Sequence, residues 1–476
     1  MRQGDFRYGK YATGVGMRLW EIEYWEDSAD LFARCATEVG AAFLDSGTAS
    51  GPQRRQDLLL RQPQAWIWED AGGVWRQDRG SEARRQTGTL FSTLRPLLEK
   101  QPVGSGSWSR LTVPLLCGFL AYDWAAGGNG SRDNKEDDQP VAVFALYDQI
   151  LLQDHQQRRA WIIASSAADD AWTTVLQRPL PDFPPFQLSP AGIRPHWSYA
   201  DYAAAYARTQ EYILAGDCYQ INLAQGFSAG WQGDPWPLYQ RLRRVSRAPF
   251  SAFFRHPWGT LLSVSPERLL RLAGGRLQAR PIKGTRRRHP DPRRDRESAA
   301  ELMASRKDRA ENLMIVDLLR NDLGKVAASG SVQVPELFSL ESYDQVHHLV
   351  SSIEADLAPG LDAWDALAAA FPGGSITGAP KHRAMEIIAE LEAGPRGIYC
   401  GCFGYVTAGG EMDWNILIRS LELNSEGELR FFGGGAIVAD SDCAAEYAES
   451  LDKVAMIRET LEAFLPQGAT CATVAR

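Results

Sequence analysis

Apolar and polar residues alternate along this chain in short strand-like runs, and three longer runs follow the 3.6-residue period of a helix. The expected strands span residues 41–44, 65–68, 141–152, 218–227, 250–254, 260–264, 269–272, 401–406, 414–421 and 429–432. The expected strong helices span residues 308–323, 380–391 and 444–465. Because 476 residues exceed one ordinary hydrophobic core, we expect two domains or one large composite unit of strands and helices.

A further helix and the strand after it have clear boundary signals. Ser198 can cap a helix that carries Tyr202 and Ile213 on one face. Gly216 can end this helix, because glycine adopts the left-handed conformation of a helix C-terminus. The run at 218–227 then alternates like a strand.

Prolines mark the main boundary along the chain. Five of them fall between Arg178 and Pro190, which disfavours helix and strand interiors alike. Residues 127–138 are charged and contain glycine, so we expect a mobile insertion there. The predicted division is a disordered extension at 1–16 with Met17 as an alternative start, an N-terminal domain at 17–190, a second domain at 191–466 and a tail at 467–476.

Composition excludes several classes of partner. Lys plus Arg total 51 against 59 for Asp plus Glu, and the net charge of -8 gives no attraction to nucleic acid or an anionic membrane. No run approaches the roughly 20 apolar residues of a membrane span. Seven cysteines without paired spacing indicate a reducing compartment. We therefore expect a cytoplasmic protein that binds neither nucleic acid nor membrane.

A carboxylate falls within the apolar stripe of the predicted helix at 308–323. On a helical wheel, Glu311 lies in the middle of Met314, Ile315 and Leu318. Such a group must be paired, protonated or bound to a cation, because an isolated buried charge is very costly. A buried salt bridge and a metal site remain equally open for this helix alone.

The predicted helix at 444–465 adds further carboxylates. Glu446, Glu449 and Lys453 lie on a narrow arc at the edge of its apolar stripe. This spacing usually indicates a Glu–Lys ion pair on the surface of a helix. Two glutamates from separate helices, with no Cys or His cluster nearby, are also what a hard cation binds. The metal predicted here is Mg²⁺ and not zinc.

Two glycine-rich loops suggest a site for a small anion. Residues 371–383 run into a helix whose first turn holds Pro380, which presents free backbone N–H groups. The spacing of a nucleotide-binding Walker loop is absent there. A second glycine run, 433–435, leads to the helix that carries Glu449. With Arg419, predicted on a strand and able to form a bidentate pair, these features predict a small polyanionic ligand beside a metal.

Lys283 is the candidate nucleophile. It stands between Pro281 and Gly284, directly after a strand-like run. A lysine at the mouth of a site can lose its proton through desolvation and attack carbon. For this segment by itself, an exposed lysine in a strand-to-loop turn is the alternative.

Seven segments, in this order along the chain, resemble the chorismate-utilising enzymes. They are residues 215–223, 265–268, 281–285, 310–322, 348–351, 376–381 and 437–441. The resemblance covers about 198–465 well, and upstream the run at 43–46 is similar to the N-terminal domain of the family. It implies an α+β fold of twisted antiparallel β-sheets flanked by helices, with an active site between the two halves.

The resemblance implies roles for these residues. It implies that Glu311 and Glu449 bind Mg²⁺, supported by Asp308 and Glu446, and that the ion holds the ring carboxylate of chorismate. Glu267 would protonate the departing 4-hydroxyl while Lys283 attacks C2, and ammonia would then attack C4 and expel the lysine. The implied substrate contacts are Gln220, Thr285, His348, Thr377, Tyr405, Arg419, Gly434, Gly435 and Lys453.

Two positions discriminate among members of the family. Members that add water carry a lysine where this chain has Gln220, which disfavours isochorismate and salicylate synthases. Anthranilate synthases typically have alanine where Lys283 stands. The expected branch is therefore aminodeoxychorismate synthase component I, of 4-aminobenzoate and folate biosynthesis. Anthranilate synthase component I and a non-catalytic chorismate or tryptophan sensor are the alternatives.

Ala436 departs from the family pattern, in which a glycine is expected before Ile437. The added methyl group is tolerable in extended backbone and would crowd a ligand only where φ is positive.

The resemblance also implies partners. The chain has no Cys-His-Glu glutaminase signature, so a separate glutamine amidotransferase subunit would supply the ammonia. The N-terminal domain of relatives can bind tryptophan, and Ser46, Pro249 and Phe250 are the candidates for such a site.

Overall fold

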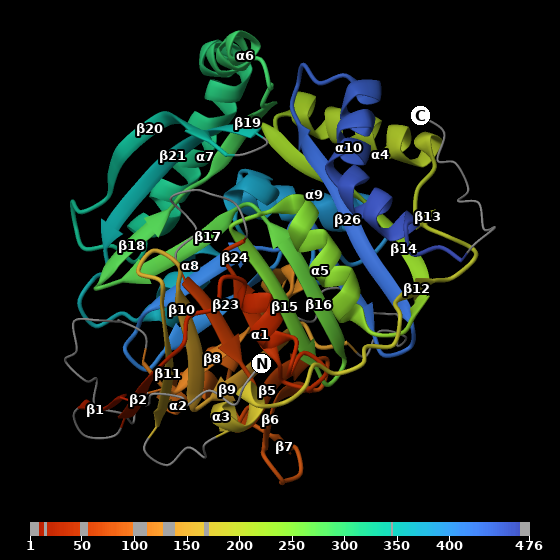
Figure 1. Ribbon diagram of the computed structural model, residues 1–476. Helices are drawn as coiled ribbons and strands as arrows, with labels where there is room; N and C mark the ends of the chain where they lie inside the picture. Colours follow the sequence, from red (N-terminus) through yellow and green to blue (C-terminus); the bar gives the residue numbers. More distant parts are fainter. Residues whose placement is uncertain are drawn as a thin grey trace.

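Two large antiparallel sheets flanked by helices form the protein (Figure 1). The computed structural model describes residues 9–13, 17–47, 56–98, 112–126, 139–165, 171–343 and 346–466. The α+β fold class expected from the sequence is confirmed.

The first sheet has 14 strands and begins with N-terminal residues. In the order of neighbouring strands it contains β1 (Gly9–Thr13), β2 (Met17–Ile22), β11 (Arg159–Ser165), β10 (Gln149–Asp154), β4 (Gln56–Leu60), β3 (Ala42–Asp45), β15 (Phe250–His256), β16 (Gly259–Ser265), β25 (Ser420–Asn424), β26 (Glu428–Ile437), β14 (Gln220–Gln232) and β12 (Gln187–Leu188). The short strands β13 (Arg194–Pro195) and β22 (Gly378–Ala379) also pair with β14.

The second sheet has 12 strands. In order they are β19 (Ile282–Arg287), β21 (Val346–Asp356), β18 (Arg276–Ala279), β17 (Arg268–Ala273), β24 (Met412–Ile416), β23 (Cys402–Thr407), β8 (Leu115–Leu120), β9 (Ala142–Tyr147), β5 (Ala65–Asp70), β6 (Gly73–Asp78) and β7 (Arg84–Arg85). Strand β20 (Gln333–Ser342) pairs with β21.

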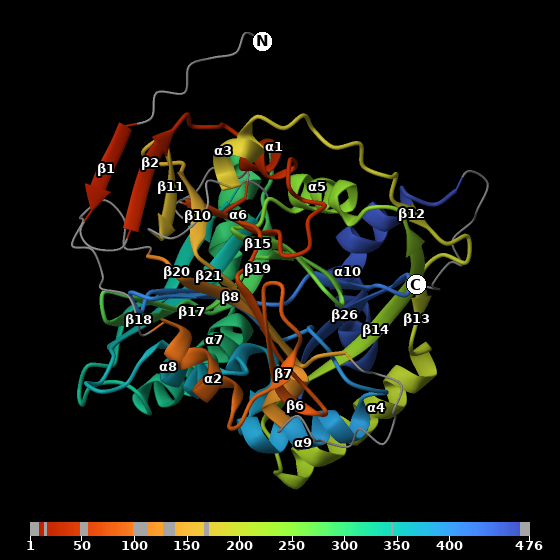
Figure 2. The same cartoon turned by 90° about the horizontal axis from the view of Figure 1, so that it is seen from below.

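Helices cover the outer surfaces of the sheets. They are α1 (Ser28–Phe32), α2 (Leu90–Leu98), α3 (Ala171–Leu176), α4 (Tyr199–Ala215), α5 (Pro235–Ser246), α6 (Pro292–Ala304), α7 (Arg306–Gly324), α8 (Ala363–Ala370), α9 (Lys381–Leu391) and α10 (Cys443–Glu462), with short 3₁₀ helices at Tyr122–Ala126 and Gly374–Ile376. Helix α10 packs on β26, α7 packs on β19 and β21, and α4 lies beside α9 (Figures 1 and 2). None of the helices in the described ranges is both long enough and apolar enough to span a membrane.

Both sheets combine strands from the two sides of the proline-rich segment. In the first sheet β3 pairs with β15, so that Asp45 lies opposite Ser251. In the second sheet β8 pairs with β23 along its whole length. The sequence boundary near residue 190 therefore does not separate one sheet from the other. The part of the chain after this boundary is held in place by upstream strands.

Several local predictions agree with the structure. Ser198 forms a capping box with Asp201 at the start of α4, and Gly216 ends the helix with φ at 86°. The predicted helices at 308–323, 380–391 and 444–465 correspond to α7, α9 and α10.

Other predictions need correction. Residues 141–152 form two strands, β9 and β10, instead of one, because the chain turns at Asp148. Residues 9–13 of the supposed N-terminal extension form β1, which pairs with β2. The predicted strand at 414–421 is interrupted, since Arg419 has a φ of 51° between β24 and β25. The segment 127–138 and the tail 467–476 lie outside the described residues.

A buried ion-pair cluster joins α5 to the upstream part of the chain. Arg243 donates to Asp27 at 3.0 Å and to Asp45 at 3.2 Å, and its side chain is 3% exposed. Tyr239 donates to the same Asp45 at 3.1 Å. This cluster fixes α5 against α1 and β3 by charge-assisted hydrogen bonds.

We expect Arg243→Met to destabilise the protein by about 3–5 kcal/mol, because it leaves the carboxylate of Asp45 buried without its main cation. Urea unfolding followed by tryptophan fluorescence measures the loss. Arg244→Met is the matched control, since Arg244 is exposed on the same helix. Equal unfolding midpoints for the two variants would contradict a role for the buried cluster.

Candidate active site

A cavity of about 660 Å³ lies where the first sheet, the second sheet, α7 and α10 meet. It collects most of the residues singled out in the sequence. Those that line it are Glu267, Lys283, Thr285, Asp308, Glu311, His348, Arg419, Gly434, Ala436, Glu449 and Lys453. Residues that are far apart in the sequence therefore converge on one cavity.

Lys283 is the second residue of β19 and reaches into this cavity. Its Nζ donates to the carbonyl of Ser375 at 3.3 Å. The neighbouring Gly284 has a φ of 83°, and a Cβ there would lie 2.9 Å from the side chain of Asp308. Glycine thus permits β19 to pass close to the start of α7, which places the lysine beside the acidic residues of that helix.

Glu267 lies in the short link between β16 and β17 and is 6% exposed. Burial raises the pKa of its carboxyl, although Lys283 and hydrogen bonds from Ser375 and the Ile282 backbone oppose the shift. Burial likewise lowers the pKa of Lys283, while Glu311 acts in the opposite direction. Burial therefore favours a protonated Glu267 carboxyl and a neutral Lys283 amine in the same cavity.

Acidic side chains from two helices face each other across the cavity. Burial raises the pKa of Glu311, and the charges of Asp308 and Glu449 add to that shift. Burial also raises the pKa of Glu446, with Glu449 again contributing. Glu449 has a lowered pKa, because Lys453 at 2.6 Å outweighs the effect of burial. This concentration of negative charge favours the binding of a cation.

These carboxylates are suited to supply part of the ligand shell of a Mg²⁺ ion and not the whole shell. No three acidic, histidine or cysteine side chains within the described ranges converge tightly enough to form a full ligand set. Mg²⁺ commonly takes only one or two protein carboxylates and completes its shell with water and substrate oxygens. The carboxylate of Glu311 accepts no hydrogen bond in the described part of the chain, and its one ion-pair partner there is Lys307, 4.0 Å away. Its carboxylate is thus available to a cation.

The position of Glu311 on α7 differs from the helical-wheel prediction. The most buried face of the helix carries Asn312, Ile315, Val316 and Leu319. Glu311 lies at the edge of this face, and its side chain is 18% exposed. The Glu311 carboxylate, which the sequence placed within the apolar stripe of α7, therefore borders a cavity and not the packed core.

Glycines of β26 allow α10 to approach the sheet closely. A Cβ on Gly435 would lie 3.2 Å from Glu446 and 3.3 Å from Glu449. A Cβ on Gly433 would lie 2.5 Å from the carbonyl of Ser450. A side chain at position 433 would push the helix backbone away, and a side chain at position 435 would displace the carboxylates of Glu446 and Glu449.

Arg419 provides a cationic group in the same cavity. The guanidinium of Arg419 makes no hydrogen bond or ion pair within the described ranges. Burial lowers its pKa. His348 lies nearby and shares a hydrogen bond of 2.9 Å with the Thr285 hydroxyl. Burial and Arg419 lower the pKa of His348 to about 4, so its imidazole is neutral at ordinary pH. An arginine without a partner in a closed site is suited to bind a carboxylate.

Some predicted contacts lie outside the cavity. Thr377 is buried and its hydroxyl donates to the carbonyl of Gly373 at 3.1 Å. Gln220 is fully buried on β14 opposite Ala379. Gly435 and Glu446 form the wall behind Glu449. The Gly-rich loop reaches the cavity through residues 375–376, and the start of α9 does not line it.

Ala436 lines the cavity without backbone strain. It lies within β26 opposite Asn222 and has no positive φ. The methyl group is therefore accommodated in extended backbone.

Sequence reasoning missed several lining residues, among them Asn222, Ser375 and Tyr399. Asn222 and Ser375 belong to segments that had already been singled out, so their neighbours gave a usable signal. Tyr399 carries no such signal, because only the packing of its loop brings it to the cavity.

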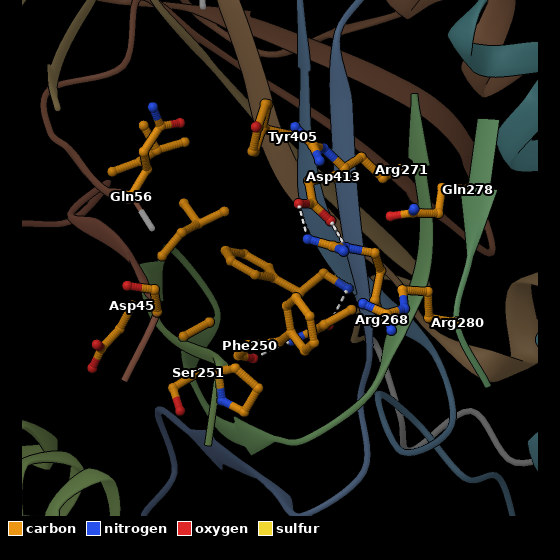
Figure 3. A pocket seen from close by; sticks show the side chains of 17 residues that line it. Asp45, Gln56, Phe250, Ser251, Arg268, Arg271, Gln278, Arg280, Tyr405 and Asp413 are labelled. Atoms are coloured by element: carbon orange, nitrogen blue, oxygen red, sulfur yellow. Dashed lines mark hydrogen bonds and ion pairs between the residues drawn. The ribbon is translucent and has the colours of Figure 1, made fainter. Parts of the chain in front are cut away.

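A second pocket, of about 250 Å³, lies between the two sheets on the upstream side (Figure 3). Ser46, Pro249 and Phe250 all line it, as does Tyr405, which was expected in the substrate site. Tyr405 is on β23, whose register places it opposite Asp413 at this pocket. The structure therefore places Tyr405 in this pocket and not among the residues that line the active cavity.

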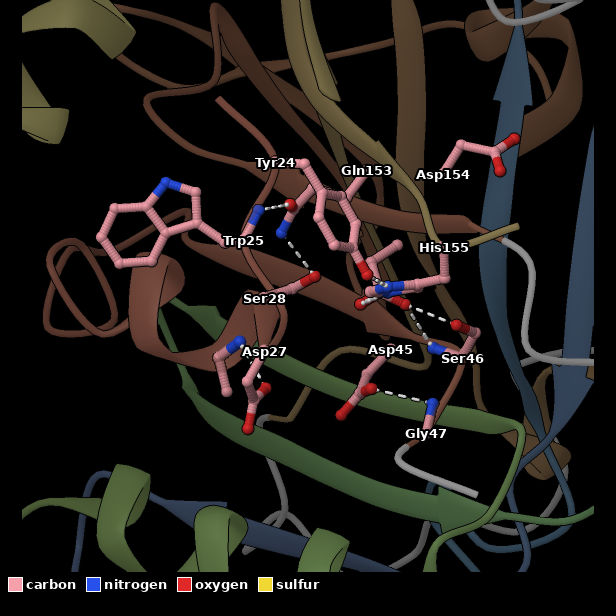
Figure 4. A network of polar contacts seen from close by, with 12 residues as sticks. Tyr24, Trp25, Asp27, Ser28, Asp45, Ser46, Gly47, Gln153, Asp154 and His155 are labelled. Carbon is pink, nitrogen blue, oxygen red and sulfur yellow. Dashed lines mark hydrogen bonds and ion pairs between the residues drawn. The ribbon is translucent and has the colours of Figure 1, made fainter. Parts of the chain in front are cut away.

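A chain of hydrogen bonds supports the position of Ser46 (Figure 4). The Asp57 carboxylate accepts from the Ser46 hydroxyl at 2.7 Å and from its backbone N–H at 2.8 Å. The other carboxylate oxygen lies 2.7 Å from His155 Nε2, and Tyr24 lies 2.8 Å from His155 Nδ1. These bonds lower the pKa of Asp57 against the effect of burial. One wall of the second pocket is thus rigidly held.

Comparisons with known proteins agree with this geometry. The family model described as chorismate binding enzyme matches residues 48–459. The chain is 43% identical over 428 residues to aminodeoxychorismate synthase component 1 of Salmonella typhimurium, covering 89% of this chain and 93% of that protein. It is 48% identical over 442 residues to the protein of the same name from Klebsiella aerogenes, covering 90% and 96%.

Similarity extends to other chorismate enzymes. Anthranilate synthase component 1 of Cereibacter sphaeroides is 39% identical over 444 residues, with 88% of each chain covered. The crystal structure of anthranilate synthase component I from Streptococcus pneumoniae matches with a TM-score of 0.74 at 28% identity, covering 86% of this chain and 93% of that one. With a family model matching most of its length and relatives well above 30% identity, this chain belongs to the chorismate binding enzyme family.

Proposed function

We propose that this chain acts as the chorismate-converting component of an aminodeoxychorismate synthase and makes 4-amino-4-deoxychorismate from chorismate and ammonia. The observation that carries this proposal is the pairing of a desolvated Lys283 with a buried Glu267 in one cavity. A general acid and a nucleophile can together replace a ring hydroxyl by an amine in two displacements. The similarity to the aminodeoxychorismate synthases supports the same branch.

The proposed reaction exchanges groups at C4 in two displacements. The neutral amine of Lys283 forms a bond to C2, the two ring double bonds shift, and the C4–O bond breaks. Glu267 gives its proton to the departing hydroxyl, which leaves as water. Ammonia then forms the C4–N bond, the double bonds shift back, and the C2–Nζ bond breaks to free the lysine. Proton transfer from the new ammonium group restores Glu267.

The other lining residues would bind and orient chorismate. Arg419 supplies an unpaired guanidinium that would bind one of the carboxylates of chorismate. Glu311 and Glu449 would hold Mg²⁺, which when bound neutralises negative charge at the ring carboxylate. Asp308, which lines the cavity, and Glu446, which lies behind Glu449, would support these ligands. Thr285 and His348 lie along the same wall and would contact the ring.

Two further ligands belong to this proposal. A glutamine amidotransferase subunit would release the ammonia, as the component 1 naming of relatives suggests. The second pocket would bind tryptophan, because Ser46, Pro249 and Phe250 meet there beside the cationic Arg268, Arg271 and Arg280.

We expect the purified chain, given chorismate, Mg²⁺ and an ammonium salt, to yield a product in which an amino group replaces a hydroxyl and the pyruvyl ether is retained. Mass spectrometry distinguishes this product from anthranilate with released pyruvate, which would favour the anthranilate synthase alternative. Unchanged chorismate, also in the presence of the amidotransferase subunit, would favour a sensor.

Lys283→Ala is expected to abolish aminodeoxychorismate formation, because alanine cannot form the bond to C2. Product analysis by mass spectrometry measures the loss, and equal chorismate binding by calorimetry separates chemistry from affinity. Lys325→Ala is the control, since Lys325 follows the end of α7 and does not line the cavity. Full turnover in Lys283→Ala would refute the nucleophile.

Glu267→Gln is expected to lower kcat by about 10²–10⁴, the usual contribution of a general acid. It should also remove one limb of the bell-shaped dependence of kcat/KM on pH, because one of the two essential ionising groups is gone. Glu426→Gln serves as the control, because Glu426 is exposed in the turn before β26. An unchanged pH profile in Glu267→Gln would assign the proton to another group.

Glu311→Gln is expected to weaken Mg²⁺ activation by about 10–100-fold or more in metal concentration, since one carboxylate ligand becomes neutral. Titration of activity with Mg²⁺ and direct calorimetry of metal binding measure the change. Glu301→Gln, on the exposed side of α6, is the comparison variant. Identical metal titrations in both variants would contradict the assignment.

A further inference from the structure

The turn that leads from β26 into α10, residues 437–441, does not line the active cavity. Two hydrogen bonds close it. The N–H of Ser441 donates to the carbonyl of Val438 at 3.1 Å, and the N–H of Val438 donates to the hydroxyl of Ser441 at 3.1 Å. Because a serine hydroxyl has a single proton, this accepted bond leaves that proton to be donated elsewhere.

The Ser441 hydroxyl donates its proton to Glu446. The donor lies 2.7 Å from Oε1 of Glu446, a side chain that is buried against the sheet. The other carboxylate oxygen, Oε2, lies beside Gly435, where Oε1 of Glu449 also lies. The last torsion of a glutamate side chain has broad preferences, so a donor on one oxygen decides where the other points. Ser441 thus directs Oε2 toward the acidic group that lines the cavity.

Helix α4 holds this turn from outside the cavity. The Nε2 group of Gln210 donates to the carbonyl of Val438 at 2.8 Å and to the hydroxyl of Tyr206 at 3.0 Å. The Tyr206 hydroxyl in turn donates to the carbonyl of Ser441. Residues four apart on a helix lie on the same face. Two neighbouring side chains of α4 therefore bind both ends of the turn.

Aromatic packing fixes α4 against α10 next to these hydrogen bonds (Figure 1). The ring of Tyr447 on α10 meets Tyr202 edge to face, with centroids 5.2 Å apart, and Tyr199 in the same way at 5.0 Å. Tyr202 is fully buried. Since packed interiors resist displacement, α4 is a firm base for the contacts of Tyr206 and Gln210.

We propose that Tyr206, Gln210 and Ser441 are positioning residues that orient the Glu446 carboxylate for the binding of Mg²⁺. This inference rests on the proposed function, which assigns the cation to the acidic residues of α7 and α10. Groups that hydrogen-bond to the residues around a metal orient them, and their loss commonly costs about 10–100-fold in metal affinity. None of the three residues lines the active cavity, so each acts on the cation through Glu446.

The test removes single hydrogen-bonding groups from the full chain. Ser441→Ala deletes the donor to Glu446, whereas Ser441→Thr keeps a hydroxyl. Tyr206→Phe deletes the donor to the turn. Tyr212→Phe is its matched control, because the Tyr212 hydroxyl lies on the same helix and donates to Glu390 at 2.8 and 2.9 Å. The readouts are calorimetry with Mg²⁺ alone, the Mg²⁺ concentration for half-maximal turnover, and the unfolding midpoint without metal.

We expect Ser441→Ala to weaken Mg²⁺ binding by about tenfold, because the carboxylate loses its orienting donor. Tyr206→Phe and Gln210→Leu act one step further away and should weaken it by about threefold. Ser441→Thr should rescue the affinity, and Tyr212→Phe should retain it. Excess Mg²⁺ should restore turnover in the weakened variants, since the affected step is metal binding.

Equal Mg²⁺ affinity in Ser441→Ala and the unmodified chain would overturn this inference. An equal loss of affinity in Tyr206→Phe and Tyr212→Phe would also overturn it, because any lost hydroxyl on α4 would then have the same effect. A lower unfolding midpoint without a change in Mg²⁺ affinity would assign the three residues to stability alone. Turnover of the unmodified chain that is independent of Mg²⁺ would instead refute the metal site of the proposed function.

Discussion

The close approach of α10 to the glycine run of β26 is the constraint on which the active site depends. Backbone without side chains at Gly433 and Gly435 lets Ser450 and Glu449 lie against the sheet. Any Cβ at these positions would meet helix atoms at 2.5–3.3 Å. The separation of α10 from the sheet thus follows mainly from Gly433, which faces the helix backbone, and Gly435 leaves room for the side-chain ends of Glu446 and Glu449.

Charge balance in the cavity follows from this geometry. Burial and the charge of Glu449 raise the pKa of Glu311 on α7 and of Glu446 on α10, whereas Lys453 and Arg419 place positive charge in the same cavity. Because desolvation acts against every charged form, the cavity is most stable when a cation and an anion enter together. A divalent metal with a dicarboxylate substrate would satisfy that requirement, and in the proposed reaction Lys283 and Glu267 would act as the nucleophile and the acid.

The upstream half of the chain supports the site from behind. Strands β3 and β8 complete the two sheets that carry the functional strands, and the Arg243 cluster fastens α5 to them. The rigid hydrogen-bond chain from Asp57 to Tyr24 ends at the second pocket. A ligand held there would stabilise both sheets at once, because the pocket is lined by strands of each.

The sequence by itself determined the local elements and the family. The Ser198 cap, the Gly216 stop and the long helices were readable because capping and 3.6-residue periodicity are local properties. Ordered motifs were sufficient to indicate the family and the residues of the cavity. Tertiary structure alone decided that Tyr405 belongs to another pocket, that Arg419 leaves its strand, and that β1 pairs with β2. These features depend on the pairing of strands far apart in the chain, which no local pattern encodes.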